Sequence, residues 1–175
     1  ENKGQDLLEK LYTKAGVKDN LKRYEDVLQG FVREFGEKDV KLFSSPGRTE
    51  ISGNHTDHNN GKVLGGSINL DCIAAAADNG SDTVNIISES FSQKFSIDIN
   101  DIKPGAERVG TTELLKGILA GFTERNAKIG GFDAYITSNV ISSAGVSSSA
   151  AFETLICQII NTLFNDGKLS KTDYA

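Results

Sequence analysis

A strand, a loop of small residues and an amphipathic helix follow one another in the last third of the chain, and this succession constrains the fold most. Phe132 to Thr137 is typical of a short strand, and the loop SNVISSAGVSSSAAFE runs from Ser138 to Glu153. Apolar residues then recur with helical spacing, which predicts one buried face of a helix ending at Gly167. These residues are Phe152, Leu155, Ile156, Ile159, Ile160, Leu163 and Phe164.

The loop has the composition that suits a phosphate group. The first turn of a helix presents free N–H groups and the positive end of the helix dipole. Gly145 lets the backbone approach an anion, and the hydroxyls of Ser147, Ser148 and Ser149 add donors or a metal ligand. Serine also caps helices and occurs in ordinary turns, so a purely structural role stays open. The loop is neither a Walker A sequence nor GxGxxG.

Polar residues gather between Ser44 and Gly66. The group comprises Arg48, Glu50, Asn54, His55, Asp57, His58 and Asn59. Carboxylates, amides and imidazoles can bind the hydroxyls of a polyhydroxylated ligand, and an arginine favours developing negative charge. Asn60-Gly61 predicts a hairpin turn, so a solvated loop is the alternative. A metal site at His55 and His58 is a weaker alternative, because the surrounding glycines and asparagines argue against a helix there.

The remaining elements are helices near the N-terminus and a run of strands. Leu7 to Tyr12 predicts a short helix that stops at Gly16, and Asp19 or Asn20 predicts the cap of a second helix ending at Gly36. Strands are predicted at 40–43, 67–77, 83–88 and 93–99, and a helix from Thr111 or Thr112 to about Asn126. Alanines in the strand 67–77 indicate close packing against another element. This order predicts an α+β fold with helices covering one face of a mixed sheet.

Composition and charge disfavour several classes of function. The chain has 175 residues, enough for one domain with a sizeable core. Its net charge of −5 gives no bulk attraction to nucleic acids or anionic membranes. No apolar run approaches the roughly 20 residues of a membrane span. Cys72 and Cys157 lie in apolar contexts, which predicts buried free thiols and a reducing, cytoplasmic compartment.

Two stretches together resemble one family. SPGRTEISGNHTDHNNG, from Ser45 to Gly61, resembles the galactokinase signature PGRxNLIGEHTDYNxG. SNVISSAGVSSSAAFE resembles the phosphate-loop motif PxGxGLSSSAA of the GHMP small-molecule kinases. The motifs occur in the family's order and spacing, and the resemblance extends from about Phe31 to the end of the chain. It implies the fold of the GHMP kinase N-terminal domain, which is similar to the second domain of ribosomal protein S5.

The resemblance also implies a reaction, phosphoryl transfer from MgATP to the anomeric hydroxyl of galactose. It places Arg48 near the transferred phosphoryl group and the sugar, and Asn54, His55 and Asp57 at sugar hydroxyls. It assigns ATP binding to Ser143, Ala144, Gly145, Val146, Ser147, Ser148 and Ser149, and Mg²⁺ binding to Ser149. The expected partners are a small sugar and ATP, with no nucleic acid and no membrane.

Departures from the family pattern leave the sugar open. Asn54 replaces the family's glutamate, and His58 replaces the usual tyrosine. Ile141 and Ser143 replace the proline and a glycine of the phosphate loop. The first two leave room for a kinase of arabinose, N-acetylgalactosamine or a uronic acid, or for a galactokinase-like regulator that binds sugar and ATP. An RNA-binding domain similar to S5 is disfavoured by the acidic composition.

Family members are considerably longer than this chain. Their aspartate base, the glutamate that shares Mg²⁺ and the second domain all follow the region that the chain resembles. We therefore expect residues 1–175 to form one domain, with a sugar-binding loop at 44–66 and a phosphate loop at 138–153. We expect this domain to be the N-terminal part of a kinase whose C-terminal domain is absent, and to be inactive alone.

Overall fold

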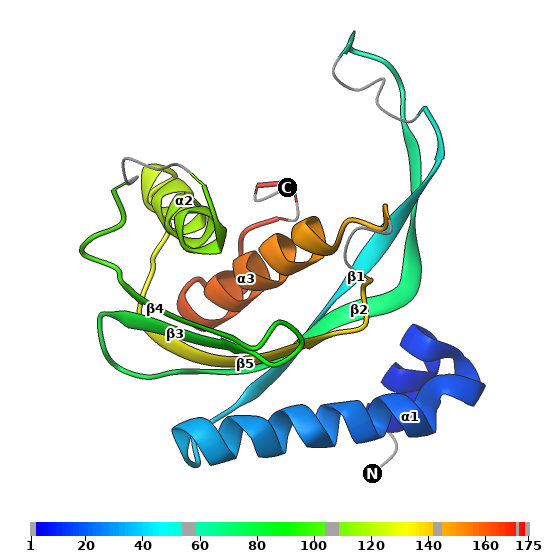
Figure 1. Cartoon of the computed structure of the whole chain (residues 1–175), viewed down its shortest axis with the longest axis horizontal. Helices are drawn as coiled ribbons and strands as arrows, with labels where there is room; N and C mark the ends of the chain where they lie inside the picture. Colours follow the sequence, from blue (N-terminus) through cyan, green and yellow to red (C-terminus); the bar gives the residue numbers. More distant parts are fainter. Residues whose placement is uncertain (1–2, 54–58, 104–108, 142–144, 171, 174–175) are drawn as a thin grey trace.

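The computed structural model describes residues 3–53, 59–103, 109–141, 145–170 and 172–173 of the chain. A five-stranded sheet and three helices make up this part of the molecule (Figure 1). In chain order the elements are α1 (Lys3–Phe35), β1 (Lys41–Ser52), β2 (Leu64–Asp78), β3 (Thr83–Ser88), β4 (Gln93–Asp98), α2 (Thr111–Glu124), β5 (Phe132–Ser138) and α3 (Ser148–Phe164). Within the described residues, none of the helices is long and apolar enough to cross a membrane.

The sheet is mixed, as predicted. Its strand order is β1-β2-β5-β3-β4, and β3 runs parallel to β5 while the other neighbours are antiparallel. β1 and β2 are longer than predicted and extend from the body of the molecule as a two-stranded arm (Figure 1). Part of the predicted loop 44–66 is therefore strand, because backbone pairing such as that of Glu50 with Gly65 continues through its polar residues.

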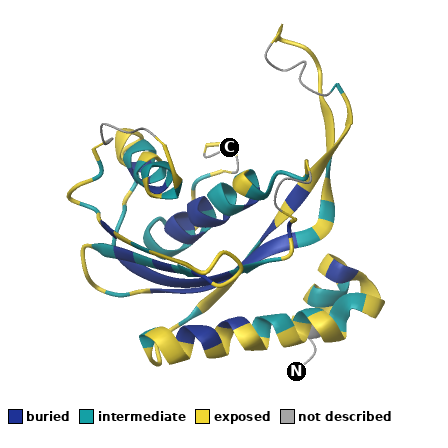
Figure 2. Cartoon of the chain, in the orientation of Figure 1, coloured by how far each residue is buried: buried dark blue, intermediate teal, exposed yellow. Residues whose placement is uncertain are grey.

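Helices cover both faces of the sheet, so the predicted one-sided arrangement is wrong. α2 and α3 pack on one face and α1 lies on the other, with the buried residues of the sheet between them (Figures 1 and 2). Ala74 and Ala76 of β2 belong to the core beneath α2 and α3, whereas Ala75 and Ala77 belong to the core beneath α1. Because successive side chains of a strand point to opposite faces, the alanine run is buried on both sides. The expected close packing of this strand is confirmed.

The helix ends differ from the prediction in detail. α1 breaks at Thr13, where φ is 64° and ψ is 163°, and not at Gly16. Asn20 does not cap a helix: its amide nitrogen donates to the Gly16 carbonyl within α1. Gly110 holds the N-cap position of α2, so neither Thr111 nor Thr112 does. The predicted apolar face of α3 is confirmed, with its central residues fully buried.

The two cysteines are free and buried, as predicted. Burial raises the pKa of the Cys72 thiol to about 12 and that of Cys157 to about 11. Both thiols are therefore protonated at neutral pH, and neither is an activated nucleophile.

Candidate functional site

β1 carries the first part of the segment 44–66 that is predicted to bind the sugar. Pro46 lies opposite Asp71 of β2, and the strand register shifts between Pro46 and Arg48. The Arg48 Nη2 atom lies 3.7 Å from Glu50 Oε1, and 54% of the Arg48 side chain is exposed. Because an ion pair this open to water is weak, the Arg48 guanidinium is free to turn toward a bound ligand.

The sugar-contacting residues implied by the resemblance, Asn54, His55 and Asp57, lie outside the described residues, and so does His58. Their contacts with a sugar stay predictions. Nearby, Asn60 adopts a left-handed conformation with φ of 58°, and β1 and β2 form an antiparallel pair on either side. The antiparallel pairing and a turn at Asn60 agree with the prediction, but the strands end at Ser52 and Leu64, so Asn60-Gly61 is not a two-residue hairpin turn that joins them directly. In the part of the chain that is described, no His, Cys, Asp and Glu side chains form a group of three that could hold a metal ion.

The loop predicted to bind phosphate follows β5 and precedes α3, as expected from the sequence. Ser143 and Ala144 lie outside the described residues. Gly145 has φ of 73°, and a Cβ added there would meet no atom within 4 Å, so the backbone is open to an approaching group. Ser147 is left-handed as well, and its side chain makes no capping hydrogen bond to α3. The first N–H groups of α3 have no acceptor within the helix, which leaves them available to an anion.

A backbone hydrogen bond joins the two loops. The N–H of Arg48 donates to the carbonyl oxygen of Val146 over 3.2 Å. Gly47 permits this approach, because a Cβ there would lie 2.9 Å from the Val146 oxygen and 3.0 Å from Val140 Cγ1. The structure therefore brings Arg48 next to the phosphate loop, although the two are far apart in the sequence.

Ser149 has a partner that the sequence analysis did not single out. The Ser149 hydroxyl donates to Glu153 Oε1 over 2.7 Å, one helical turn further along α3. A hydroxyl whose proton is directed to a carboxylate keeps its oxygen lone pairs for another partner. Hydroxyl and carboxylate oxygens are the hard donors that Mg²⁺ prefers, so this pair fits the metal expected here. The four-residue spacing between Ser149 and Glu153 was the signal that could have predicted the contact.

A pocket of about 300 Å³ adjoins the start of α3. Ser148, Ser149 and Phe152 line one side of it, and Phe91 and Phe95 from the β3–β4 region line another. It thus combines hydroxyls of the phosphate loop with aromatic rings. The contribution of Phe91 and Phe95 was missed, because only the folded chain brings these residues to α3.

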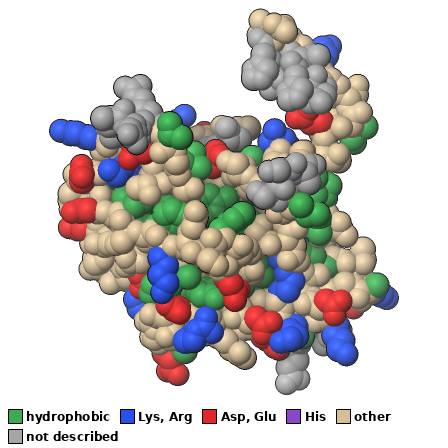
Figure 3. Space-filling view, viewed as in Figure 1, with side chains coloured by type: hydrophobic (Ala, Val, Ile, Leu, Met, Phe, Trp, Pro, Cys, Tyr) green, Lys and Arg blue, Asp and Glu red, His purple; other side chains and the backbone are tan. Residues whose placement is uncertain are grey.

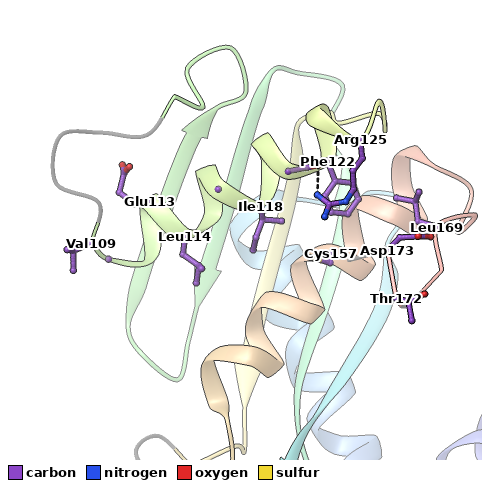
Figure 4. A pocket seen from close by; sticks show the side chains of 13 residues that line it. Val109, Glu113, Leu114, Ile118, Phe122, Arg125, Cys157, Leu169, Thr172 and Asp173 are labelled. Atoms are coloured by element: carbon purple, nitrogen blue, oxygen red, sulfur yellow. Dashed lines mark hydrogen bonds between the residues drawn. The ribbon is translucent and has the colours of Figure 1, made fainter. Parts of the chain in front are cut away.

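A larger pocket, of about 780 Å³, lies between α2, α3 and the residues Leu169, Thr172 and Asp173. In Figure 4, Leu114, Ile118 and Phe122 project from α2 toward Cys157 and Leu169. Figure 3 shows apolar side chains gathered over this region of the surface. Of the predicted site residues that the structure describes, none lines this pocket. Its size therefore does not make it the functional site, whereas the smaller pocket touches the phosphate loop.

Two known protein families match the two regions of the chain that contain the predicted sugar-binding segment and the predicted phosphate-binding loop. The galactokinase galactose-binding signature matches residues 29–78, and the GHMP kinases N-terminal domain matches residues 113–175. The chain belongs to the galactokinase family of GHMP kinases. The predicted fold class and family are thereby confirmed.

Individual galactokinases resemble most of the chain. The galactokinase of Clostridium tetani is 35% identical over 157 residues, which are 88% of this chain and 39% of that protein. The galactokinase of Clostridium perfringens (strain ATCC 13124) is 36% identical over 150 residues, which are 83% of this chain and 38% of that protein. The chain thus spans about two fifths of the length of these galactokinases.

Solved structures agree with this membership. The crystal structure of Lactococcus lactis galactokinase complexed with galactose matches with a TM-score of 0.79 and 25% identity, over 86% of this chain and 39% of that chain. Methanococcus jannaschii mevalonate kinase matches with a TM-score of 0.62 and 17% identity, over 77% of this chain and 43% of that chain. The second similarity concerns the fold alone.

Proposed function

We propose that this chain supplies the sugar- and nucleotide-binding part of an ATP-dependent galactokinase. The reaction transfers the γ-phosphoryl group of MgATP to the anomeric hydroxyl of galactose. The observation that supports the proposal is the Arg48–Val146 backbone hydrogen bond, because it joins the segment that matches the galactokinase galactose-binding signature to the loop predicted to bind phosphate. Phosphoryl transfer depends mainly on such positioning and on stabilising charge.

In this proposal the phosphate loop binds the phosphates of ATP. Residues 143–149 are proposed to contact the phosphates; among those that the structure describes, Gly145 provides open space, and the first turn of α3 provides N–H donors. Ser149 is proposed to hold Mg²⁺, with Glu153 directing its hydroxyl. When bound, the metal ion neutralises charge that builds up on the phosphates. The pocket beside Ser149 has aromatic walls at Phe91 and Phe152, which suit the base of the nucleotide.

The sugar-binding loop is proposed to hold galactose. Asn54, His55 and Asp57 would bind its hydroxyls, as the family resemblance implies, and Arg48 would stabilise negative charge on the transferred group. We further propose that the general base and a second domain come from the remaining length of the protein, since the related galactokinases are much longer than this chain. Residues 1–175 alone are then expected to show no substantial turnover.

The deciding experiment is a kinase assay on the full natural protein that contains this sequence. The protein is mixed with MgATP and one sugar from a panel of galactose, arabinose, N-acetylgalactosamine, galacturonic acid and glucose, and ADP release is followed. Release that depends on galactose is the expected result. Release with another sugar instead would show that Asn54 and His58 change the substrate.

Two further outcomes separate the alternatives. Calorimetric binding of galactose and MgATP without ADP release would identify a regulator in place of an enzyme. The absence of both ligand binding and ADP release would overturn the proposed function. The 175-residue chain is measured in parallel, and substantial ATP-dependent phosphorylation by that chain alone would contradict the proposed need for further residues.

A further inference from the structure

Asp71 of β2 is a buried carboxylate whose residue is only 2% exposed. Arg23 Nη1 donates to one carboxylate oxygen over 2.8 Å, and Ser44 Oγ donates to the other over 2.6 Å. The hydroxyl of Tyr12 also donates to the second oxygen. A charge buried in an apolar strand is unfavourable without such partners. Here the partners come from both α1 and β1, so Asp71 connects elements that are separate in the sequence.

Asp71 lies at the root of both functional loops. Its partner Ser44 comes just before Pro46, and Pro46 is paired with Asp71 in the sheet. On the other side, the Asp71 carbonyl accepts a hydrogen bond of 3.0 Å from the N–H of Asn139, where β5 passes into the phosphate loop. One residue therefore fixes the entry to the sugar-binding loop with its carboxylate and the entry to the phosphate loop with its backbone.

α1 reaches Asp71 from both sides of its break at Thr13. Tyr12 precedes the break and Arg23 follows it. The Tyr12 hydroxyl uses its hydrogen in the hydrogen bond to Asp71. In the 3.0 Å contact between the Tyr12 and Tyr24 hydroxyls, Tyr24 is therefore the donor. Burial, and next the hydrogen bond to Asp71, raise the pKa of Tyr12 well above its ordinary value, so Tyr12 remains a donor at neutral pH.

We propose that Asp71 is a positioning residue, which holds Ser44 and Asn139 so that the Arg48 N–H meets the Val146 carbonyl. An effect of Asp71 on catalysis rests on the proposed function. The hydrogen bond between Arg48 and Val146, which Asp71 is proposed to position, forms without a ligand. Asp71 does not reach the transferred group in this account. It acts through the two strands that carry Arg48 and the phosphate loop.

Asp133 offers a matched control. It is another buried carboxylate, 4% exposed, and it lies on β5, opposite Ala77 and so at the other end of the β2–β5 pairing. Lys38, Asn79 and Asn85 donate to it. Replacing Asp133 removes a comparable buried charge, but none of these three partners belongs to either loop.

Amide hydrogen exchange in the 175-residue chain tests the positioning directly. In Asp71→Asn, the Arg48 amide is expected to exchange about 10-fold faster than the change in global stability alone would give. In Asp133→Asn, the exchange rate of the Arg48 amide is expected to change only as much as the change in global stability predicts. Tyr12→Phe removes a single donor to Asp71, and an increase of about 3-fold at Arg48 is expected, so the test remains decisive if Asp71→Asn does not fold. The proposal would be overturned if the exchange rate of the Arg48 amide changed only as much as global stability predicts in each of the variants Asp71→Asn and Tyr12→Phe that folds.

Kinetics of the full natural protein give the second readout. Asp71→Asn is expected to lower kcat about 10-fold or more through misalignment, whereas Asp133→Asn is expected to keep kcat near that of the unmodified protein. An unchanged kcat in Asp71→Asn would also overturn the positioning role. If the unmodified protein phosphorylates no sugar, the proposed function fails, and the exchange experiment alone then decides whether Asp71 organises the two loops.

Discussion

The backbone N–H of Arg48 donates to the carbonyl oxygen of Val146 over 3.2 Å. The bond connects β1 to the loop ahead of α3, and it uses main-chain atoms on both sides. What it requires from the sequence is therefore space between the two backbones, not a particular side chain at either end. That space is provided by Gly47, which packs against the Val146 oxygen and the Val140 side chain.

Gly47→Ala is therefore expected to destabilise the fold. The added Cβ would lie 2.9 Å from a backbone oxygen, and a backbone atom cannot move aside as easily as the end of a flexible side chain. We expect a loss of about 1–3 kcal/mol in the free energy of unfolding, measured by urea denaturation. Gly117→Ala is the control, because its Cβ would meet no atom within 4 Å in α2, and a gain of about 0.5–1 kcal/mol is expected. Equal stability of Gly47→Ala and the unmodified chain would show that there is room for a side chain between residue 47 and the Val146 carbonyl oxygen.

Ser149→Ala is expected to weaken MgATP binding without unfolding the protein. Ser149 is exposed, so removing its hydroxyl disturbs little packing, but it removes the oxygen proposed to hold the metal ion. We expect about 10-fold weaker binding by calorimetry in the full natural protein, with Ser149→Thr restoring most of it. Ser96→Ala, an exposed serine on β4, is the control and is expected to bind normally. Unchanged affinity in Ser149→Ala would remove Ser149 from the proposed metal site.

Local sequence patterns predicted the elements that carry the site. The apolar spacing that includes Leu155 and Ile159 predicted α3, and Asn60-Gly61 predicted a turn at Asn60, within the longer connection between β1 and β2. These signals depend on residues that are close in the sequence, so one sequence is enough to read them. The roles expected for Asn54, His55 and Asp57 depend on the family resemblance and remain predictions.

Long-range packing accounts for what the sequence did not predict. A helical pattern shows which side of α1 is apolar, but not which face of the sheet it covers. The approach of Phe91 to Ser149 likewise exists only after β3, β4 and α3 have packed together. Asp71 was not singled out in the sequence, although an aspartate within the apolar strand 67–77 could have signalled a buried charge that needs partners. The identity of those partners, Tyr12, Arg23 and Ser44, required the folded chain.

Thr13→Gly is expected to stabilise the fold. Thr13 has φ of 64° and ψ of 163°, a backbone region that non-glycine residues rarely adopt and that is most unfavourable for a β-branched side chain. Relief of this strain exceeds the added entropy of glycine in the unfolded chain, so we expect a gain of about 1 kcal/mol in urea denaturation. The same change at the exposed helical residue Lys18 is expected to cost about 1 kcal/mol. Similar losses at both positions would show that Thr13 carries no strain.

Asp133 is expected to make stability depend on pH in the acid range. Burial disfavours its ionised form, but hydrogen bonds from Lys38, Asn79 and Asn85 outweigh burial and hold its pKa below the ordinary value of 3.8. A carboxyl with a lowered pKa in the folded state stabilises that state while it is ionised. This contribution is present above the ordinary pKa and is lost as the pH falls through the lower pKa of the folded state.

Asp133→Asn should therefore destabilise the chain at pH 7, and its difference from the unmodified chain should shrink in acid. We expect a loss of about 2–3 kcal/mol at pH 7, because charged hydrogen bonds at a buried site are broken. The gap should begin to narrow below about pH 4, where Asp133 of the unfolded chain takes up a proton, and should continue to narrow as the pH falls through the lower pKa of the folded state. Urea denaturation at pH 7, 5 and 3 measures both effects. Asp26→Asn is the control, since Asp26 pairs with Lys22 at the surface and should matter little at any pH. A gap for Asp133→Asn that stays constant down to pH 3 would contradict the lowered pKa.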